Sequence, residues 1–411
     1  MTDSTEQLYV GVDWATAEHR VVVLDAERRV IDERSVRQEG SALEAWATWL
    51  SDQVGGRVDT VAVALETPRG AVVDTLLARG FRVFALNPKQ LDRFRDRFTV
   101  AGAKDDRRDA RVLADALATD RRAFRQLAPE DPRVIELREL ARLEEDLQEE
   151  LVRLTNRLRE QLSRFFPQLL QLSSAADEPW LWALLERAPT PSAARALARA
   201  TVRHVLQRYR IRRVSPDDVV AVLRTPALPV APGTVEAAHA HVGVLLPRLR
   251  LLQTQRATCA ARIDTLLEQL AESQEHRDVA ILRSLPGVGR VVTATMLAEA
   301  SRLLAARDYH GLRAHSGVAP VTKQSGQRKI VTMRYACNHR LRLATHYWGQ
   351  SAVLHDPRSH AHYARLRACG HSHGRALRGV VDRLLRVLVA MLTTQSVYEP
   401  ARRVAVAATA P

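Results

Sequence analysis

The sequence has little cysteine, few lysines and no long apolar run. Its three cysteines, Cys259, Cys337 and Cys369, are too few and too scattered for a disulfide framework, which predicts a reducing cytoplasmic environment. No apolar run approaches the ~20 residues that a membrane helix needs. No signal peptide precedes the first motif, so we expect neither a membrane protein nor a secreted one.

Acidic residues are also scarce relative to basic ones. The chain has 61 Lys and Arg but only 47 Asp and Glu, a formal net charge of +14. An excess of this size favours an anionic partner, and nucleic acid above a membrane surface. Codon bias in a GC-rich genome explains why arginine replaces lysine, but it does not explain the excess itself. Only four lysines are present: Lys89, Lys104, Lys323 and Lys329.

With 411 residues, the chain is too long for one compact core, and we expect two or three domains. Period-two patterns predict three short strands between residues 8 and 37, and a helix follows at 41–50. A buried strand at 60–66, a helix at 70–80, a strand at 81–87 and a helix opened by Pro88 come next. This βββαβαβα order predicts an α/β ribonuclease-H-like domain over residues 1–125, although many α/β folds would tolerate it.

The composition changes near Pro132 to long helix with leucines spaced by three or four residues. We expect a helical coiled-coil connector at 126–275, ended first by Pro167, with an inserted helical section at 173–235 and a return helix at 236–274. A mostly α carboxy-terminal domain should follow at 276–400, ending in a helix at 374–394, with a disordered tail at 401–411. The spaced leucines are Leu140, Leu143, Leu147, Leu151, Leu154, Leu158 and Leu162.

Four carboxylates are candidates for a metal site. Asp13 ends the first strand and Glu66 ends the buried strand, whereas Asp106 and Asp109 are spaced to share one helix face. Carboxylates gathered together repel each other, and a divalent cation relieves that repulsion. Oxygen-only ligands suit Mg²⁺, and a magnesium pair can activate and neutralise the oxygens of a phosphodiester.

Motifs in both halves of the chain resemble one family. "VGVDWA", "ALETPRG" and "GAKDDRRDARVLADAL" are similar to the amino-terminal DEDD, RuvC-like domain of insertion-sequence one-ten family transposases. "LPGVGRVVTATMLAEA", "GLRAHSGVAPVTKQSG" and "NHRLRLA" are similar to the carboxy-terminal transposase domain of that family. The resemblance implies that Asp13, Glu66, Asp106 and Asp109 form the magnesium tetrad.

The resemblance also implies the reaction and the partners. It implies a bacterial DNA recombinase at the nucleoid that works as a dimer or tetramer, with a structured bridge RNA choosing the DNA sequence. In the family, a serine after "G-x-A-P" attacks DNA, and the matching residue is Ser325; Ser316 is the alternative. No base lies close to Ser325 in sequence, which favours assistance from the carboxylates. Nucleic-acid-binding candidates are Lys104, Arg107, Lys323, Arg328, Lys329, Gly287 and Gly289.

Several alternatives stay open at this point. A RuvC-like hydrolytic junction nuclease would use only the four carboxylates, a site-specific invertase would share the same fold, and an architectural DNA-binding protein would leave the carboxylates idle. "LPGVG" is typical of half a helix-hairpin-helix or of a plain glycine turn. Cys369, His371 and His373 lack the second ligand pair of a zinc site. Trp180 and Trp182 suit either base stacking or, more commonly, core packing.

Overall fold

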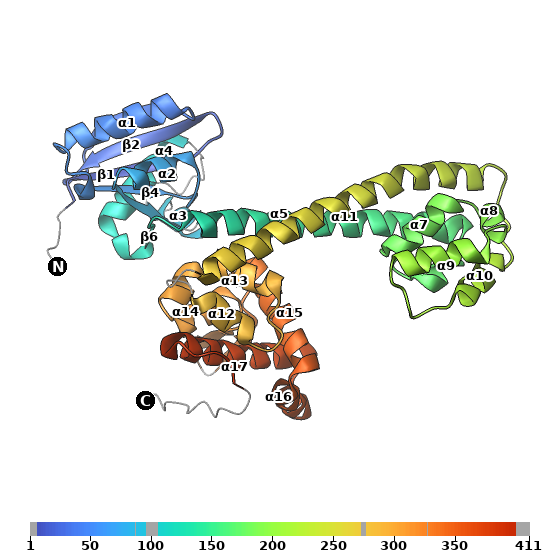
Figure 1. Cartoon of the computed structure of the whole chain (residues 1–411). Helices are drawn as coiled ribbons and strands as arrows, with labels where there is room; N and C mark the ends of the chain where they lie inside the picture. The colour runs from blue at the N-terminus through green and yellow to red at the C-terminus, as the bar shows by residue number, and fades with distance from the viewer. Residues whose placement is uncertain (1–5, 87, 96–105, 273–276, 327, 400–411) are drawn as a thin grey trace. The chain divides into compact units, whose positions relative to one another are not determined.

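The computed structural model describes residues 6–86, 88–95, 106–272, 277–326 and 328–399, and the chain divides into two compact units, 1–131 and 132–411 (Figure 1). Each unit has its own secondary-structure class. The first is a mixed α/β unit built on a six-stranded sheet, and in the second the helices greatly outnumber the strands. None of the helices within the described ranges is long and apolar enough to cross a membrane.

The sheet of the first unit has the strand order β3-β2-β1-β4-β5-β6. Its centre is parallel, because β1, β4 and β5 run in one direction, and the flanking strands pair antiparallel. The three amino-terminal strands and the two central ones lie where the sequence predicts them, whereas the short β6 was not predicted. The strands are β1 (Leu8–Asp13), β2 (Glu18–Asp25), β3 (Val30–Arg37), β4 (Val61–Leu65), β5 (Arg82–Ala85) and β6 (Arg125–Gln126).

Helices cover both faces of this sheet. Helices α1 (Gly40–Gln53) and α2 (Ala71–Ala78) pack on the face formed by large aliphatic residues such as Val10 and Val63. Helices α3 (Pro88–Arg95) and α4 (Asp106–Thr119) pack on the opposite face, where β4 presents only alanines. Alternation along each strand sorts the residues between the two layers. Two short 3₁₀ turns, Val58–Thr60 and Arg121–Ala123, complete the unit.

Two long helices, α5 (Pro132–Phe165) and α11 (Thr234–Glu272), run antiparallel in the second unit. Ion pairs fix this direction, because successive glutamates of α5 meet arginines at decreasing positions of α11: Glu136 with Arg262, Glu144 with Arg256 and Glu150 with Arg248. The expected antiparallel return is therefore confirmed. A coiled-coil geometry for the pair stays a prediction.

The section between the two long helices forms a small helical core of its own. Trp180 and Trp182 are each 1% exposed within it, so their role is core packing and the base-stacking alternative is wrong. The capping box of Ser215 and Asp218 begins its last helix. Its helices are α6 (Leu169–Leu172), α7 (Pro179–Arg187), α8 (Pro191–Arg195), α9 (Arg199–Arg208) and α10 (Pro216–Arg224).

The carboxy-terminal part packs around α17, and it contains a β-hairpin that the sequence did not predict. The core joins residues of α12, α13, α15 and α17 to Leu137 of α5 and Ile263 of α11. The elements are α12 (Arg277–Ser284), α13 (Arg290–Ala305), α14 (Tyr309–His315), β7 (Val321–Ser325), β8 (Arg328–Thr332), α15 (His339–His355), α16 (Pro357–Ala368) and α17 (His373–Thr394).

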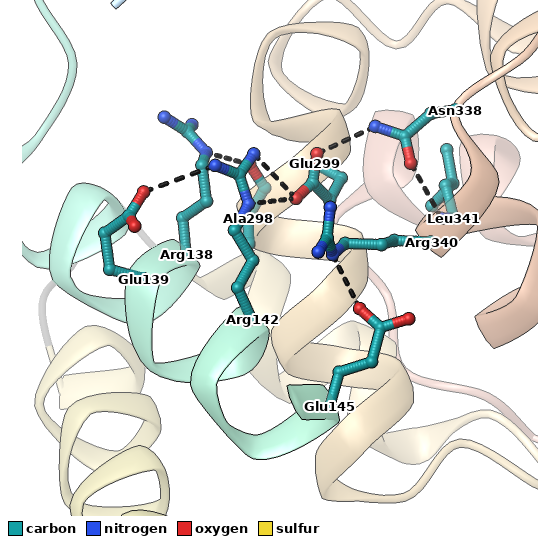
Figure 2. Close-up of polar contacts among 9 residues, drawn as sticks. All are labelled: Arg138, Glu139, Arg142, Glu145, Ala298, Glu299, Asn338, Arg340 and Leu341. Carbon is teal, nitrogen blue, oxygen red and sulfur yellow. Dashed lines mark hydrogen bonds and ion pairs between the residues drawn. The ribbon is translucent and has the colours of Figure 1, made fainter. Parts of the chain in front are cut away.

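A polar network ties α5 to α13 and to the start of α15 (Figure 2). The Arg142 guanidinium is 3.1 Å from Glu299 Oε1, and Asn338 Nδ2 donates to the other oxygen of Glu299 at 2.7 Å. Arg138 Nε donates to the Ala298 carbonyl at 2.8 Å, just before the irregular backbone at Ala300. Because Glu299 is only 9% exposed, its charge is satisfied almost entirely by these partners.

Candidate active site and nucleic-acid interface

Two of the predicted carboxylates lie at one edge of the sheet. Asp13 is the last residue of β1, and Glu66 directly follows β4. The parallel pairing of these strands ends at Val12 and Leu65, so Asp13 and Glu66 come next on the two neighbouring strands. Adjacent strands lie about 4.8 Å apart. The backbone therefore brings these two residues together at the carboxyl edge of the sheet.

Helix α4 reaches the same face of the sheet because Gly11 has no side chain. A Cβ at Gly11 would lie 1.8 Å from the Ala110 carbonyl oxygen and 2.7 Å from the Ala114 nitrogen. The helix thus rests directly on the backbone of β1. Since alternate strand residues share a face, Asp13 lies on the face that α4 covers. Asp109, which precedes Ala110, is 2% exposed.

An ion pair shows which end of α4 approaches the carboxylates. Asp115, in the second half of α4, pairs at 3.3 Å with Arg28, which lies in the turn after β2. That turn is at the opposite edge of the sheet, because Asp25 pairs with Leu8 at the beginning of β1. The first turn of α4 therefore points toward Asp13 and Glu66.

The remaining members of the predicted metal site are only partly described. Asp106 begins α4 one turn before Asp109, but its side chain lies outside the described residues, as do Lys104 and Asp105. Among the side chains that are described, no three His, Cys, Asp or Glu lie close enough together to hold a metal ion. The donors at this edge are carboxylate oxygens, the ligand type that suits Mg²⁺. The tetrad thus stays a prediction.

Sequence reasoning missed Arg20, which lies directly opposite Asp13 in the β1–β2 pairing. Arg20, Glu33, Arg34 and Arg107 line an open hollow of about 320 Å³. Arg107, a predicted nucleic-acid contact, forms an ion pair with Glu33. The available signal was an arginine that interrupts the apolar strand "EHRVVVLD". The arrangement places cationic side chains beside the carboxylate edge.

Ser325 is the last residue of β7, at the tip of an exposed hairpin. Gly326 follows with φ +56°, a left-handed conformation that suits glycine in a tight hairpin turn. Ser325 pairs directly with Arg328, and Lys323 pairs with Ile330 two positions away. Opposed residues of an antiparallel ladder share a face, so Ser325, Arg328 and Lys323 lie on one side.

Lys329 lies on the other side of the hairpin. It pairs with Gln324, and this pair is the next one along the ladder from the Ser325–Arg328 pair. Successive residues of a strand point to opposite faces. Both strands are exposed apart from the half-buried Val321. An isolated two-stranded hairpin is marginally stable in water. The ordered structure of this hairpin therefore depends on the residues at its base.

The alternative nucleophile, Ser316, is buried. It is 1% exposed, and its hydroxyl donates to the Leu312 carbonyl at 2.7 Å. The residue therefore caps the carboxy-terminal end of α14 as a packing serine. It offers a matched control for Ser325.

The "LPGVG" segment is the turn between α12 and α13. Gly287 has φ +79°, and a Cβ there would lie 2.6 Å from the Ala352 nitrogen. Trp348 Nε1 donates to the Pro286 carbonyl at 2.9 Å, which fixes the turn against α15. Gly289 precedes α13, with nothing within 4 Å of its Cβ position. Gly287 thus has a packing role, and a phosphate contact for either glycine stays a prediction.

The net positive charge of the chain comes from the second unit. Residues 1–131 contain 20 Lys and Arg but 23 Asp and Glu, whereas residues 132–411 contain 41 Lys and Arg and 24 Asp and Glu. The formal net charges are therefore −3 and +17. Residues 309–381, which include the Ser325 hairpin, contain 12 Lys and Arg and a single acidic residue, Asp356. This segment is the strongest candidate for contact with a polyanion.

Comparisons with known proteins cover both units. A profile of the DEDD domain of IS110 transposases, described as a transposase, matches residues 10–167. A second profile, described as the transposase IS116/IS110/IS902 family, matches residues 279–364.

Curated relatives match over part or all of the chain. The chain is 53% identical over 214 residues to the putative transposase y4uE of Sinorhizobium fredii, a match covering 52% of the chain and 59% of that protein. It is 30% identical over 413 residues, 98% of both chains, to the mini-circle putative transposase for IS117 of Streptomyces coelicolor. It is 29% identical over 422 residues, again 98% of both, to the IS116 44.8 kDa protein of Streptomyces clavuligerus.

Proposed function

The chain belongs to the IS116/IS110/IS902 family of transposases, and from that premise we propose that it cuts and rejoins DNA through a covalent link to Ser325. The observation that carries this proposal is the position of Ser325 at the tip of an exposed hairpin, with Arg328 directly opposite and Lys323 on the same face. A nucleophile that attacks a DNA backbone must be reachable, and cations beside it favour the approach of a phosphate.

The proposed reaction conserves the phosphodiester bond energy. Ser325 Oγ loses its proton and bonds to phosphorus, while the bond to the 3′ oxygen breaks and that oxygen takes up a proton. A free 3′ hydroxyl of another strand then attacks the phosphoserine, which restores a P–O3′ bond and returns the proton to Ser325. No nucleotide cofactor is needed, because each step exchanges one phosphate ester for another.

We assign Asp13, Glu66, Asp106 and Asp109 to a magnesium site in a ribonuclease-H-like domain. The assignment is supported by the common edge of Asp13 and Glu66, and by the direction of α4. An ion held there would supply charge neutralisation at the phosphodiester. Strand pairing positions Asp13 and Glu66, and the close contact of α4 with Gly11 positions Asp109. Arg20 and Arg107 then lie where they can bind a neighbouring phosphate.

The test is capture of labelled DNA on the protein. Purified protein, with its co-expressed RNA, is incubated with element-junction DNA and Mg²⁺, and the products are resolved on a denaturing gel. We expect label at protein mass for the wild type, and none for Ser325→Ala or Asp106→Ala. Ser316→Ala is the matched control and should keep the adduct, because that hydroxyl is buried.

The alternatives give different gels. Cut DNA without an adduct would establish the hydrolytic junction nuclease, and an adduct that persists in Ser325→Ala would remove Ser325 from the mechanism. Bound but intact DNA, in a preparation whose RNA has been sequenced and restored, would favour an architectural protein. Guidance by a bridge RNA, a dimeric or tetrameric assembly, and the choice between transposase and invertase chemistry remain predictions for separate measurements.

A further inference from the structure

A half-buried arginine without an acidic partner lies at the start of α17. Arg378 Nη1 donates to the Met333 sulfur at 3.3 Å, and it lies 3.6 Å from the Cβ position of Gly374. Arg378 makes no ion pair with any residue in the described ranges. A thioether is a weak acceptor, whereas a guanidinium carries five donors. Most of the hydrogen-bonding capacity of Arg378 is therefore available to a ligand.

The groups around Arg378 are cationic or aromatic. Burial lowers the pKa of Arg378, and so does the neighbouring Arg375. Burial also lowers the pKa of His346 on α15, with further lowering by His373 and Arg378. Tyr335, which is 77% exposed, adjoins the cluster from the loop after β8. We call Arg378, Arg375, His373 and His346 the α17 cluster.

The nearest acidic residue on each side of Arg378 in the sequence is already engaged elsewhere. Asp356 caps α16 by accepting from the Ser359 backbone at 2.9 Å. Asp382 accepts from the Tyr309 hydroxyl at 2.9 Å and pairs with Arg313. Partly burying a cation without a counter-charge costs free energy. An anion from outside the chain would offset that cost.

The α17 cluster is connected directly to the proposed nucleophile. Met333 follows β8 and lies five positions along the chain from Arg328, the partner of Ser325. At about 3.4 Å per strand residue, Met333 lies roughly 17 Å from the hairpin tip. One DNA strand places a phosphate about every 3.4 Å along the helix axis. A separation of this size spans several phosphates of a DNA strand, so the cluster and the hairpin tip can contact the same duplex.

We propose that the α17 cluster binds a backbone phosphate of the substrate DNA, near the phosphodiester that Ser325 attacks. This inference rests on the proposed function. DNA is the expected ligand because the cluster is continuous with the hairpin that carries the nucleophile. The contact would hold the strand in register while the exposed hairpin presents Ser325.

The test measures the affinity of the full-length protein for element-junction DNA at NaCl concentrations between 50 and 200 mM. Each phosphate contact contributes about 0.9 to the slope of log affinity against log salt. Arg378→Gln should therefore lower that slope by about 0.9 and weaken binding about tenfold at 50 mM. The control is Arg153→Gln on α5, whose side chain is 64% exposed and pairs with Glu149 in the same helix. It should leave the slope unchanged.

A second measurement identifies the phosphate. DNA carrying one uncharged methylphosphonate is tested at each position from two to eight nucleotides from the reacting bond. The wild type should lose affinity at one of these positions, and Arg378→Gln should be insensitive there. Loss of affinity for RNA of the same length without loss for DNA, or the absence of any coupled position, overturns the proposal.

Folding is controlled separately. Since Arg378 is half-buried without an acidic partner, Arg378→Gln should unfold at the wild-type temperature or above it. If it unfolds earlier, Arg375→Gln, at an exposed position of the same cluster, must still lower the slope, or the proposal fails. If the wild type forms the adduct on Ser325 but Arg378→Gln leaves the salt slope unchanged, the phosphate site alone is overturned. If Arg378→Gln lowers the salt slope but the wild type forms no adduct, the proposed function is overturned and the phosphate site stands.

Discussion

At the scale of single residues, Gly11 shows how a missing side chain places a candidate site. Its Cβ position lies 1.8 Å from the Ala110 oxygen, far closer than non-bonded heavy atoms can approach. Gly11→Ala must therefore push α4 away from β1 and misplace Asp109. We expect the free energy of unfolding to fall by about 1–3 kcal/mol, the usual cost of overpacking. Faster hydrogen exchange in 106–119 would report it.

The control for that change is Gly40→Ala. Gly40 begins α1, and nothing lies within 4 Å of its Cβ position. An added methyl group there should stabilise by about 0.4–1 kcal/mol through the unfolded chain. Unchanged exchange in α4 for Gly11→Ala would show that the helix does not depend on this contact.

The Arg142–Glu299 pair provides the second prediction at this scale. Arg142→Met leaves the nearly buried Glu299 with Asn338 as its remaining partner in Figure 2. We therefore expect the free energy of unfolding to fall by about 3–5 kcal/mol. Adding Glu299→Gln should recover part of it, because the buried charge is then removed. Urea unfolding of the single and double variants measures the coupling. Arg153→Gln, in an exposed pair, should change stability by less than about 0.5 kcal/mol.

At the scale of elements, the sequence predicted what periodicity encodes and missed what it does not. The alternating strands at 8–37 and the leucine-spaced helix from Pro132 appear where expected, because one buried face repeats in each. The hairpin "VTKQSGQRKIVT" buries no face, so it carries no such repeat. Its only local signal was Gly326 at the turn. The positions of Asp13 and Glu66 at strand ends were predicted from the sequence, whereas the place of Arg20 opposite Asp13 required the pairing register.

Helices α15 and α16 give the chain a dependence on pH. Burial lowers the pKa of His346 and of His362 below 6.5, and nearby cations add to this: His373 and Arg378 for the first, Arg365 and Arg383 for the second. Their unfolded forms therefore bind protons more readily than the folded ones. The stability from these neutral rings is present above about pH 6.5 and is lost as the pH falls through the window below it.

We expect the thermal unfolding temperature to fall between about pH 7 and pH 5.5 at constant ionic strength. The unfolding temperature of the double variant His346→Gln, His362→Gln should fall less steeply with pH. That of His355→Gln, at an exposed position, should follow the wild type. Equal slopes for the double variant and the wild type would assign the pH dependence to other groups.

At the scale of the whole molecule, the two units differ in how they can meet DNA. Residues 132–411, with a formal charge of +17, attract phosphates without assistance, whereas residues 1–131, at −3, do not. The carboxylate edge of the first unit repels a DNA backbone until cations neutralise it. DNA contacts of the second unit should therefore persist in a chelator, and those of the first should need a divalent ion.

Hydrogen exchange of the full-length protein with DNA separates the two cases. With Mg²⁺ we expect protection both near Asp13 and Glu66 and within 309–381, and with a chelator only the second set. Unrelated effects of Mg²⁺ are removed by the same comparison on Asp109→Asn, which should lose the protection near Asp13 under both conditions. Protection near Asp13 that is equal with Mg²⁺ and with chelator would mean that DNA binds the first unit through cations such as Arg20 and Arg107, without a metal.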